Sequence, residues 1–172
     1  MQNILPWVRA VLQTTPDRWI SLTEMLPIEL LARQPLSNEW SALECLQHLV
    51  DTEHSVFPAR VNYLLAGQDL PAFDPDSQGA KVQASHPPEE LAREFARMRS
   101  KSLILLEQVN ATDLDRSGLH QELGTVTLGE LVHEWAAHDL MHTVQAERAV
   151  MQPFSAGCGP WQPCFLDHWV GD

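Results

Sequence analysis

Apolar residues recur with helical spacing over residues 128–150, a stretch that contains no proline. Thr127 and Glu130 have the spacing of a capping box at its start, and Val126 and Leu131 are placed to form a hydrophobic staple. The pattern therefore predicts a helix long enough to cross a small domain.

A second mixed apolar and polar stretch covers residues 42–66. Ser41 and Glu44 again have the form of a capping box, and Trp40 stands in the staple position before it. Pro58 removes one backbone hydrogen bond within this stretch, so we expect the helix to bend there.

Two further bundle helices are predicted from start signals. Thr15-Pro16-Asp17 places a cap, a proline and an acid in their preferred order, which predicts a helix over residues 16–25 that follows a separate short helix near 3–13. A third bundle helix is expected over residues 88–109, beginning at a proline pair.

The segments between these helices are rich in proline, glycine and polar residues, which indicates connections. We expect a link with one short turn at 28–38, a loop at 68–79, a polar loop at 110–124, and an irregular tail at 151–172 with at most one short helix near 165–170. The loop at 68–79 is a candidate lid. The whole pattern predicts an all-α chain that forms one domain over residues 1–172.

Composition supports a compact domain, because 172 residues with 44% apolar content can bury a sizeable core. No apolar run approaches 18 residues, which argues against a membrane span. The first residues lack the basic start and apolar stretch of a signal peptide, so we expect a cytoplasmic protein.

The charge balance excludes one class of partner. The 11 Lys and Arg residues stand against 23 Asp and Glu residues, which gives a formal net charge of −12. Such a surface repels phosphate backbones, and no basic stripe offsets it, so we expect no nucleic-acid binding.

Three cysteines, Cys45, Cys158 and Cys164, form no Cys-x-x-Cys motif and cannot all pair within the chain. Cys45 precedes His48 by three residues and is a candidate ligand or nucleophile, although a small thiol on a helix is more often a packing residue.

The candidate chemistry lies in the long helix. His138 and His142 are four residues apart, a spacing that projects both imidazoles from one helix face toward a shared metal ion. A chain with eight histidines gives such a pair often by chance, so a third ligand is needed. His48 lies about two turns into the helix over residues 42–66 and is the candidate.

These residues resemble a known family as a set. The stretches Asn38–Glu53, with His48, and Thr125–Gln145, with His138 and His142, resemble the DinB-like (DinB/YfiT-like) metalloprotein superfamily. Order and separation agree over about residues 15–150.

The resemblance implies a four-helix bundle in which His48, His138 and His142 hold one divalent metal ion, usually nickel or zinc. It also implies a homodimer, and family members of known activity resemble transferases that use bacillithiol, mycothiol or glutathione. Three neutral nitrogen ligands leave coordination positions for water or substrate, as in catalytic sites.

The sequence fits two functions that belong to different classes. The first is a metal-dependent thiol transferase or hydrolase that acts on a small molecule; the second is a non-catalytic metal-binding or stress-associated protein. A cleft that reaches the metal would favour the enzyme. Catalytic residues are not assigned, but Glu134, one turn before His138, and Asp51, three residues after His48, are candidates to orient a ligand or relay a proton.

The other histidines are assigned outside the metal centre. By helical rotation, His133 and His54 are expected on other faces of their helices. His120 lies in the loop before the last helix and is either a surface residue or an acid or base above the site. Cys164 and His168 repeat the four-residue spacing in the tail and are taken as incidental.

Overall fold

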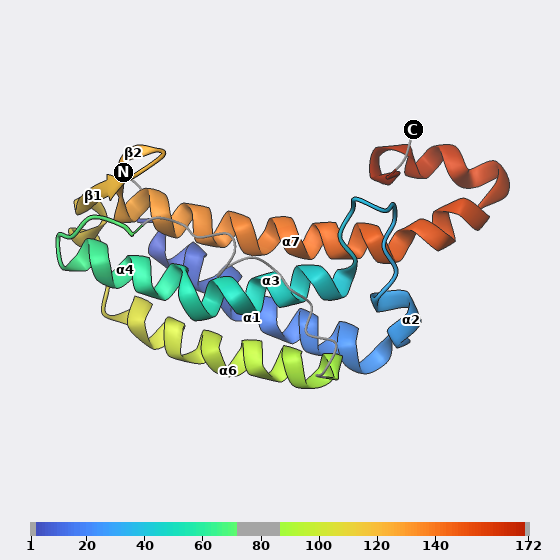
Figure 1. The fold of residues 1–172 in the computed structure, drawn as a ribbon, viewed down its shortest axis with the longest axis horizontal. Coiled ribbons are helices and arrows are strands. Elements are labelled where there is room, and N and C mark those ends of the chain that lie inside the picture. Colours follow the sequence, from blue (N-terminus) through green and yellow to red (C-terminus); the bar gives the residue numbers. More distant parts are fainter. Residues whose placement is uncertain (1–2, 72–86, 171–172) are drawn as a thin grey trace.

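The computed structural model describes residues 3–71 and 87–170. Four long helical segments lie side by side in Figure 1: α1 (Leu5–Met25), the consecutive pair α3 (Ala42–Ser55) and α4 (Phe57–Leu65), α6 (Pro88–Glu107), and α7 (Leu128–Gly157). The all-α class and the four-helix bundle are thereby confirmed.

Shorter elements lie at the two ends of the bundle. They are α2 (Ile28–Leu31), the 3-10 helices η1 (Asp113–Asp115) and η2 (Gly159–His168), and the strands β1 (Ser117–His120) and β2 (Gly124–Thr127). The short turn expected after residue 28 is present as α2. The last bundle helix continues past residue 150, and the tail after it is more helical than expected.

Both predicted capping boxes are formed. The backbone N–H of Glu44 donates to the Ser41 hydroxyl at 3.2 Å, and the Ser41 N–H donates to the Glu44 carboxylate at 2.7 Å. Thr127 and Glu130 make the same reciprocal pair at 2.7 and 3.1 Å. Local hydrogen bonding thus sets where α3 and α7 begin, and with it the positions of the histidines that follow.

The predicted division of the first helix was wrong. α1 runs through Pro16 without a break, although a proline cannot donate to the carbonyl four residues earlier, which belongs to Leu12. The Arg99 guanidinium, from α6, donates to that carbonyl at 3.1 Å. A distant side chain therefore satisfies the acceptor that the proline leaves free.

A bend was expected at Pro58, but the helix instead breaks completely at Val56, two residues earlier. Val56 has φ −114° and ψ −75°, which separates α3 from α4, and Pro58 lies in the first turn of α4, where its missing N–H has no helical acceptor to serve. Phe57 then lies beside the histidine site, and Arg60 lies farther along the same cavity.

A buried ion cluster joins three helices. The Arg99 guanidinium makes two hydrogen bonds to the Glu53 carboxylate, at 3.0 and 2.7 Å, and two to the Asp139 carboxylate, at 2.6 and 3.1 Å. All three side chains are 1% exposed. Burial alone would lower the pKa of Arg99, but Asp139 and then Glu53 outweigh it and raise the pKa, so the guanidinium stays charged. The cluster fixes α6 against α3 and α7.

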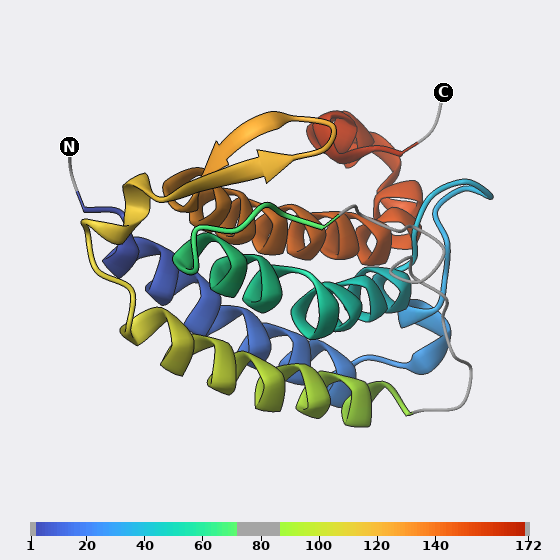
Figure 2. The same cartoon turned by 60° about the vertical axis from the view of Figure 1, so that its left-hand side comes forward.

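The segment predicted as a polar loop over residues 110–124 instead contains a β-hairpin. β1 and β2 pair antiparallel, with Ser117 opposite Thr127 and His120 opposite Gly124. Gly124 has φ +77°, a left-handed conformation that glycine adopts without steric cost, and it closes the turn. Figure 2 shows the hairpin lying over one end of the bundle.

The hairpin is fastened to the end of α4. Leu70 donates its N–H to the Leu119 carbonyl, and Leu119 donates to the Asp69 carboxylate, both at 2.9 Å. Gly118 packs so closely that a Cβ there would lie 2.4 Å from the Gln68 carbonyl oxygen. These contacts hold β1 in one position against the bundle.

Most of the loop expected at 68–79 lies outside the described residues. Within the described ranges, each helix is too short or too polar to serve as a membrane span.

Candidate metal centre

Three histidines from two helices meet inside the bundle. His48 comes from α3, and His138 and His142 come from successive turns of α7; one nitrogen from each ring lies within 4.8 Å of the others. The structure thus brings together the three residues that the sequence analysis selected. The facing rings make edge contacts, with centroids 4.6 Å apart for His48 and His142 and 4.5 Å apart for the two α7 histidines.

The spacing of the ring nitrogens suits a metal ion. His48 Nε2 and His138 Nε2 are 3.0 Å apart. Two nitrogens that each lie about 2.0–2.1 Å from one metal are separated by about 2.9 Å at a right angle and about 3.3 Å at a tetrahedral angle. The observed separation falls within this range.

The protonation state also suits metal binding, because a metal takes the lone pair of a neutral imidazole. Burial lowers the pKa of His48 to about 4, with a further contribution from His142. Burial, together with the two other histidines and Arg99, lowers the pKa of His138 to about 3. Burial likewise lowers the pKa of His142. The three rings are therefore neutral donors at physiological pH.

In residues 3–71 and 87–170, the rings of His48 and His138 contact no hydrogen-bonding partner other than each other. Within the described residues, the Nδ1 atoms of His48 and His138 are buried and have no hydrogen-bond partner. His142 differs, since its Nδ1 lies 2.9 Å from the Gln145 amide oxygen. An oxygen acceptor at Nδ1 requires the proton on that atom and leaves the Nε2 lone pair for a metal. The donor set thus fits a divalent ion.

Aromatic side chains flank the triad. Trp40 stacks on His142, with centroids 5.5 Å apart and planes 16° apart, and meets the edge of His48 at 5.0 Å. Phe57 meets the edge of His138 at 5.1 Å. These apolar rings restrict the imidazole orientations and lower the local dielectric.

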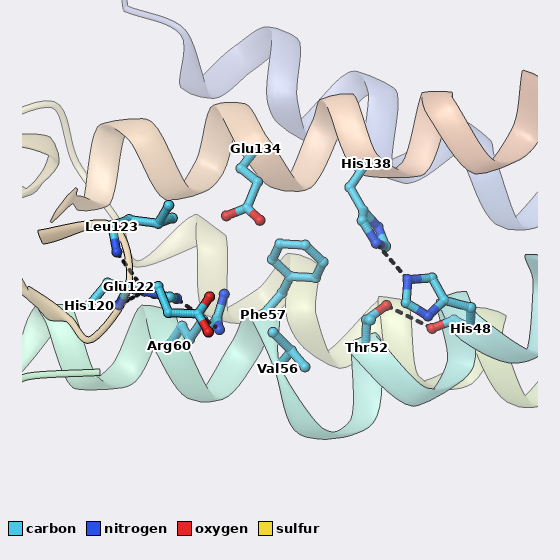
Figure 3. A pocket seen from close by; sticks show the side chains of 10 residues that line it. All are labelled: His48, Thr52, Val56, Phe57, Arg60, His120, Glu122, Leu123, Glu134 and His138. Atoms are coloured by element: carbon cyan, nitrogen blue, oxygen red, sulfur yellow. Dashed lines mark hydrogen bonds between the residues drawn. The ribbon is translucent and has the colours of Figure 1, made fainter. Parts of the chain in front are cut away.

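A cavity of about 260 Å³ reaches the triad. Figure 3 shows its wall, which runs from His48 and His138 past Phe57 to the hairpin turn, with Glu134 directed into it from α7. Its lining residues are His48, Thr52, Val56, Phe57, Arg60, His120, Glu122, Leu123, Glu134 and His138. The site is therefore open to a small molecule on one side.

The two expected helper residues have different surroundings. Glu134 lines the cavity one turn before His138, as proposed from sequence. The Asp51 carboxylate instead accepts a hydrogen bond from the Gln47 side chain at 2.9 Å and does not line the cavity. The contact to a histidine ring comes instead from Gln145, next to His142.

The remaining histidines separate into two groups. His133 and His54 are exposed, as their helical rotation predicted. His120 is only 7% exposed and lines the cavity, so the interpretation as a surface residue was wrong. His168 and Cys164, in η2, are exposed and do not belong to a metal-ligand cluster within the described residues.

Cys45 is a packing residue. Its side chain is fully buried, and burial, together with nearby Glu44, raises the pKa of the thiol to about 12. A thiol with such a pKa is neither a nucleophile nor a ready ligand at neutral pH.

The sequence analysis did not anticipate the support behind the triad. Asp139 directly follows His138 and is held by Arg99, so the buried ion cluster fixes the rotation of α7 beside the ligand position. The sequence did contain one signal of this cluster, because Arg99 stands among the positions of α6 that face the core.

Fold and site together define a helical-bundle protein with a histidine cluster suited to a divalent metal. Residues 12–146 match the model of the DinB superfamily, and the chain belongs to that superfamily. Among curated proteins, no sequence matches the chain significantly.

The solved structures that share the fold include two from Bacillus subtilis. One is YfiT from Bacillus subtilis, described as a probable metal-dependent hydrolase with an unusual four-helix bundle topology; it is 14% identical, with 87% of each chain covered and a TM-score of 0.74. The other is YjoA, a DinB-like protein from the same organism, at 19% identity, 84% of this chain and 90% of that chain covered, and a TM-score of 0.55.

Proposed function

We propose that the protein is a metal-dependent enzyme that binds one divalent ion, nickel or zinc, through His48, His138 and His142 and acts on a small molecule. The nucleophile is water, in a hydrolase, or a low-molecular-weight thiol such as bacillithiol, mycothiol or glutathione, in a transferase. The observation that carries the proposal is the cavity that reaches His48 and His138. A non-catalytic metal-binding protein would not need this access.

A divalent ion held by neutral imidazoles supplies a Lewis acid with open coordination positions, which makes water or a thiol nucleophilic at neutral pH. Glu134 supplies a carboxylate on the cavity wall that can accept the proton of the attacking group. Trp40 and Phe57 hold the imidazoles and exclude bulk water beside them.

The description of YfiT as a probable metal-dependent hydrolase supports the hydrolytic alternative. The thiol alternative is supported by the resemblance to thiol-dependent transferases. In that case the thiol comes from solution, because none of the three cysteines lines the cavity.

Cobalt substitution tests the proposal and separates its two forms. Glutathione, cysteine and 2-mercaptoethanol are each mixed with the cobalt protein, and turnover is measured with 1-chloro-2,4-dinitrobenzene for thiol transfer and with 4-nitrophenyl acetate for hydrolysis. A transferase gives a sulfur-to-cobalt absorption band and faster aromatic substitution than in free solution. A hydrolase gives ester cleavage without a thiol.

Both activities must disappear in His138→Ala and persist in His133→Ala, a matched control that removes an exposed histidine from the same helix. If the metal-loaded protein binds none of the thiols and cleaves no ester, the proposal that the protein is an enzyme is wrong. The non-catalytic alternative is then favoured.

A further inference from the structure

Two nitrogen donors face each other at the end of the cavity that lies away from the triad. Arg60, from α4, and His120, at the end of β1, both line the cavity, and Arg60 Nη2 lies 3.4 Å from His120 Nε2 (Figure 3). The chemistry of this pair depends on where the imidazole proton lies.

The hairpin turn fixes that proton. His120 Nδ1 faces the backbone N–H groups of Glu122 at 3.2 Å and Leu123 at 3.4 Å. A backbone N–H can only donate, so Nδ1 must carry a lone pair. The single proton of the neutral ring is then on Nε2, and a doubly protonated ring would point a third N–H at the two amides.

Arg60 and His120 therefore present two donors to each other, which cannot form a hydrogen bond between them. Arg60 also makes no ion pair with a carboxylate in the part of the chain that the structure describes. An oxygen that carries negative charge is the group that accepts from both nitrogens at once.

The backbone positions of both residues are set by the fold. His120 is 7% exposed and belongs to a strand fastened to the end of α4 through Leu119, Leu70 and Asp69. Arg60 is the fourth residue of that same helix. The His120 ring, which the turn amides orient, loses little conformational entropy when it binds an anion.

A bound metal ion would make the cavity more favourable for an anion. Glu122 and Glu134 also line it, and their two negative charges outnumber the single charge of Arg60. A divalent ion on three neutral histidines changes the sum of these charges from about −1 to about +1. A substrate with one anionic group then suits the cavity, with that group at the end away from the metal.

We propose that Arg60 and His120 form an oxyanion subsite that binds a carboxylate or phosphoryl group of the substrate. The assignment rests on the proposed function, because it names the substrate class of the same cavity: small anionic molecules. Arg60 supplies the charge, and His120 supplies a second donor whose direction the hairpin turn sets.

Calorimetric titration with three probes of similar size tests the subsite. Benzoate, phenylphosphonate and the neutral benzamide are each titrated into the zinc-loaded protein and into the protein treated with a chelator. We expect the zinc-loaded protein to bind one of the two anions at least tenfold more tightly than benzamide. The stronger of the two anions identifies the group as a carboxylate or a phosphoryl.

Variants separate the subsite from direct binding to the metal. In Arg60→Gln the preference for the anion should fall about tenfold or more, whereas Arg97→Gln, which removes an exposed arginine of α6, should leave it unchanged. His120→Asn keeps an acceptor near the turn amides and loses the Nε2 donor. It should retain the melting temperature and lose several-fold of the preference.

An unchanged preference in Arg60→Gln shows that the metal alone binds the anion and overturns the subsite, as does equal binding of benzamide and both anions. A different result would contradict the proposed function without contradicting the subsite. If the wild-type protein takes up no metal, yet the chelator-treated protein prefers an anion and Arg60→Gln abolishes this preference, the subsite stands and the metalloenzyme does not.

Discussion

Asp139 and Arg99 are joined by two hydrogen bonds, at 2.6 and 3.1 Å, next to the candidate metal ligand His138. Burial raises the pKa of Asp139, while Arg99 acts in the opposite direction by stabilising the carboxylate. The cluster couples the integrity of the core to the orientation of a candidate metal ligand, because consecutive residues of a helix rotate together.

Loss of the guanidinium should destabilise the fold. Arg99→Met leaves the Glu53 and Asp139 carboxylates buried without a cation, and we expect a loss of about 3–5 kcal/mol in the free energy of unfolding, measured with urea. The control is Arg97→Met on the same helix, whose side chain is 68% exposed and pairs with Glu94, and its effect should stay below about 1 kcal/mol.

If Arg99→Met does not fold, Glu53→Gln gives the smaller change, since it removes one of two negative charges and keeps the side-chain shape. An Arg99→Met protein as stable as the wild type would show that the buried cluster contributes nothing net.

Metal content should depend on each histidine of the triad. We expect about one divalent ion per chain by elemental analysis, and His48→Ala, His138→Ala or His142→Ala should each remove most of it, because two nitrogen ligands bind far more weakly than three. His133→Ala and His168→Ala should keep full content, since both residues are exposed and lie outside the cluster. Full occupancy in His48→Ala would contradict the assignment.

Glu134 should affect turnover and not metal binding. Glu134→Gln removes the proton acceptor but preserves the shape of the side chain, so we expect kcat to fall about 10²–10⁴-fold with metal content unchanged. Glu147→Gln is the matched control, an exposed carboxylate elsewhere on α7. Unchanged kcat in Glu134→Gln would remove the residue from the proton-transfer role.

The metal-free protein should lose stability in mild acid. Burial lowers the folded-state pKa of His48 to about 4 and of His138 to about 3, against 6.5 in the unfolded chain. The unfolded state therefore binds more protons between these values, so stability is full above about pH 6.5 and falls as the pH drops toward 4. The slope is at most about 1.4 kcal/mol per pH unit for each histidine.

Urea unfolding at several pH values after chelation measures this slope. The double variant with His48→Asn and His138→Asn should flatten it, and His133→Asn should not. A wild-type slope equal to that of the double variant would show that these rings are not held neutral by burial.

Thiol accessibility should distinguish the cysteines. Cys45 is fully buried and burial raises its pKa to about 12, whereas Cys158 is half-buried and Cys164 exposed. Iodoacetamide should therefore label two sites per native chain and three after denaturation, as read by intact mass. Rapid native labelling at Cys45 would contradict its assignment as a packing residue.

Local signals predicted the helix starts well. The reciprocal hydrogen bonds at Ser41 and Thr127 depend on residues only three apart, so the sequence contains all the information needed. The pair His138 and His142 is predictable for the same reason. His48 was a candidate from its place in the second predicted helix, and the family resemblance supported it, because its position opposite α7 depends on the packing of two helices.

Long-range contacts explain what the sequence did not show. Pro16 indicates a helix start unless a distant donor serves the Leu12 carbonyl, and only the folded chain shows that Arg99 does so. The hairpin escaped notice because its strands are four residues long and owe their position to Asp69 and the end of α4. For that reason the sequence could not decide between a surface position and a position above the site for His120.

The turn between the strands, residues 121–123, lies outside α3 and α7, the helices that carry the histidine triad. The same cavity is nevertheless lined by this turn and by His48 and His138. Changes of sequence at this turn can reshape the far wall of the cavity while the ligand geometry on α3 and α7 stays intact. The two ends of the cavity are thus separable in evolution and in engineering: a graft of another turn onto the β1 and β2 framework is a route to altered substrate preference in an otherwise constant bundle.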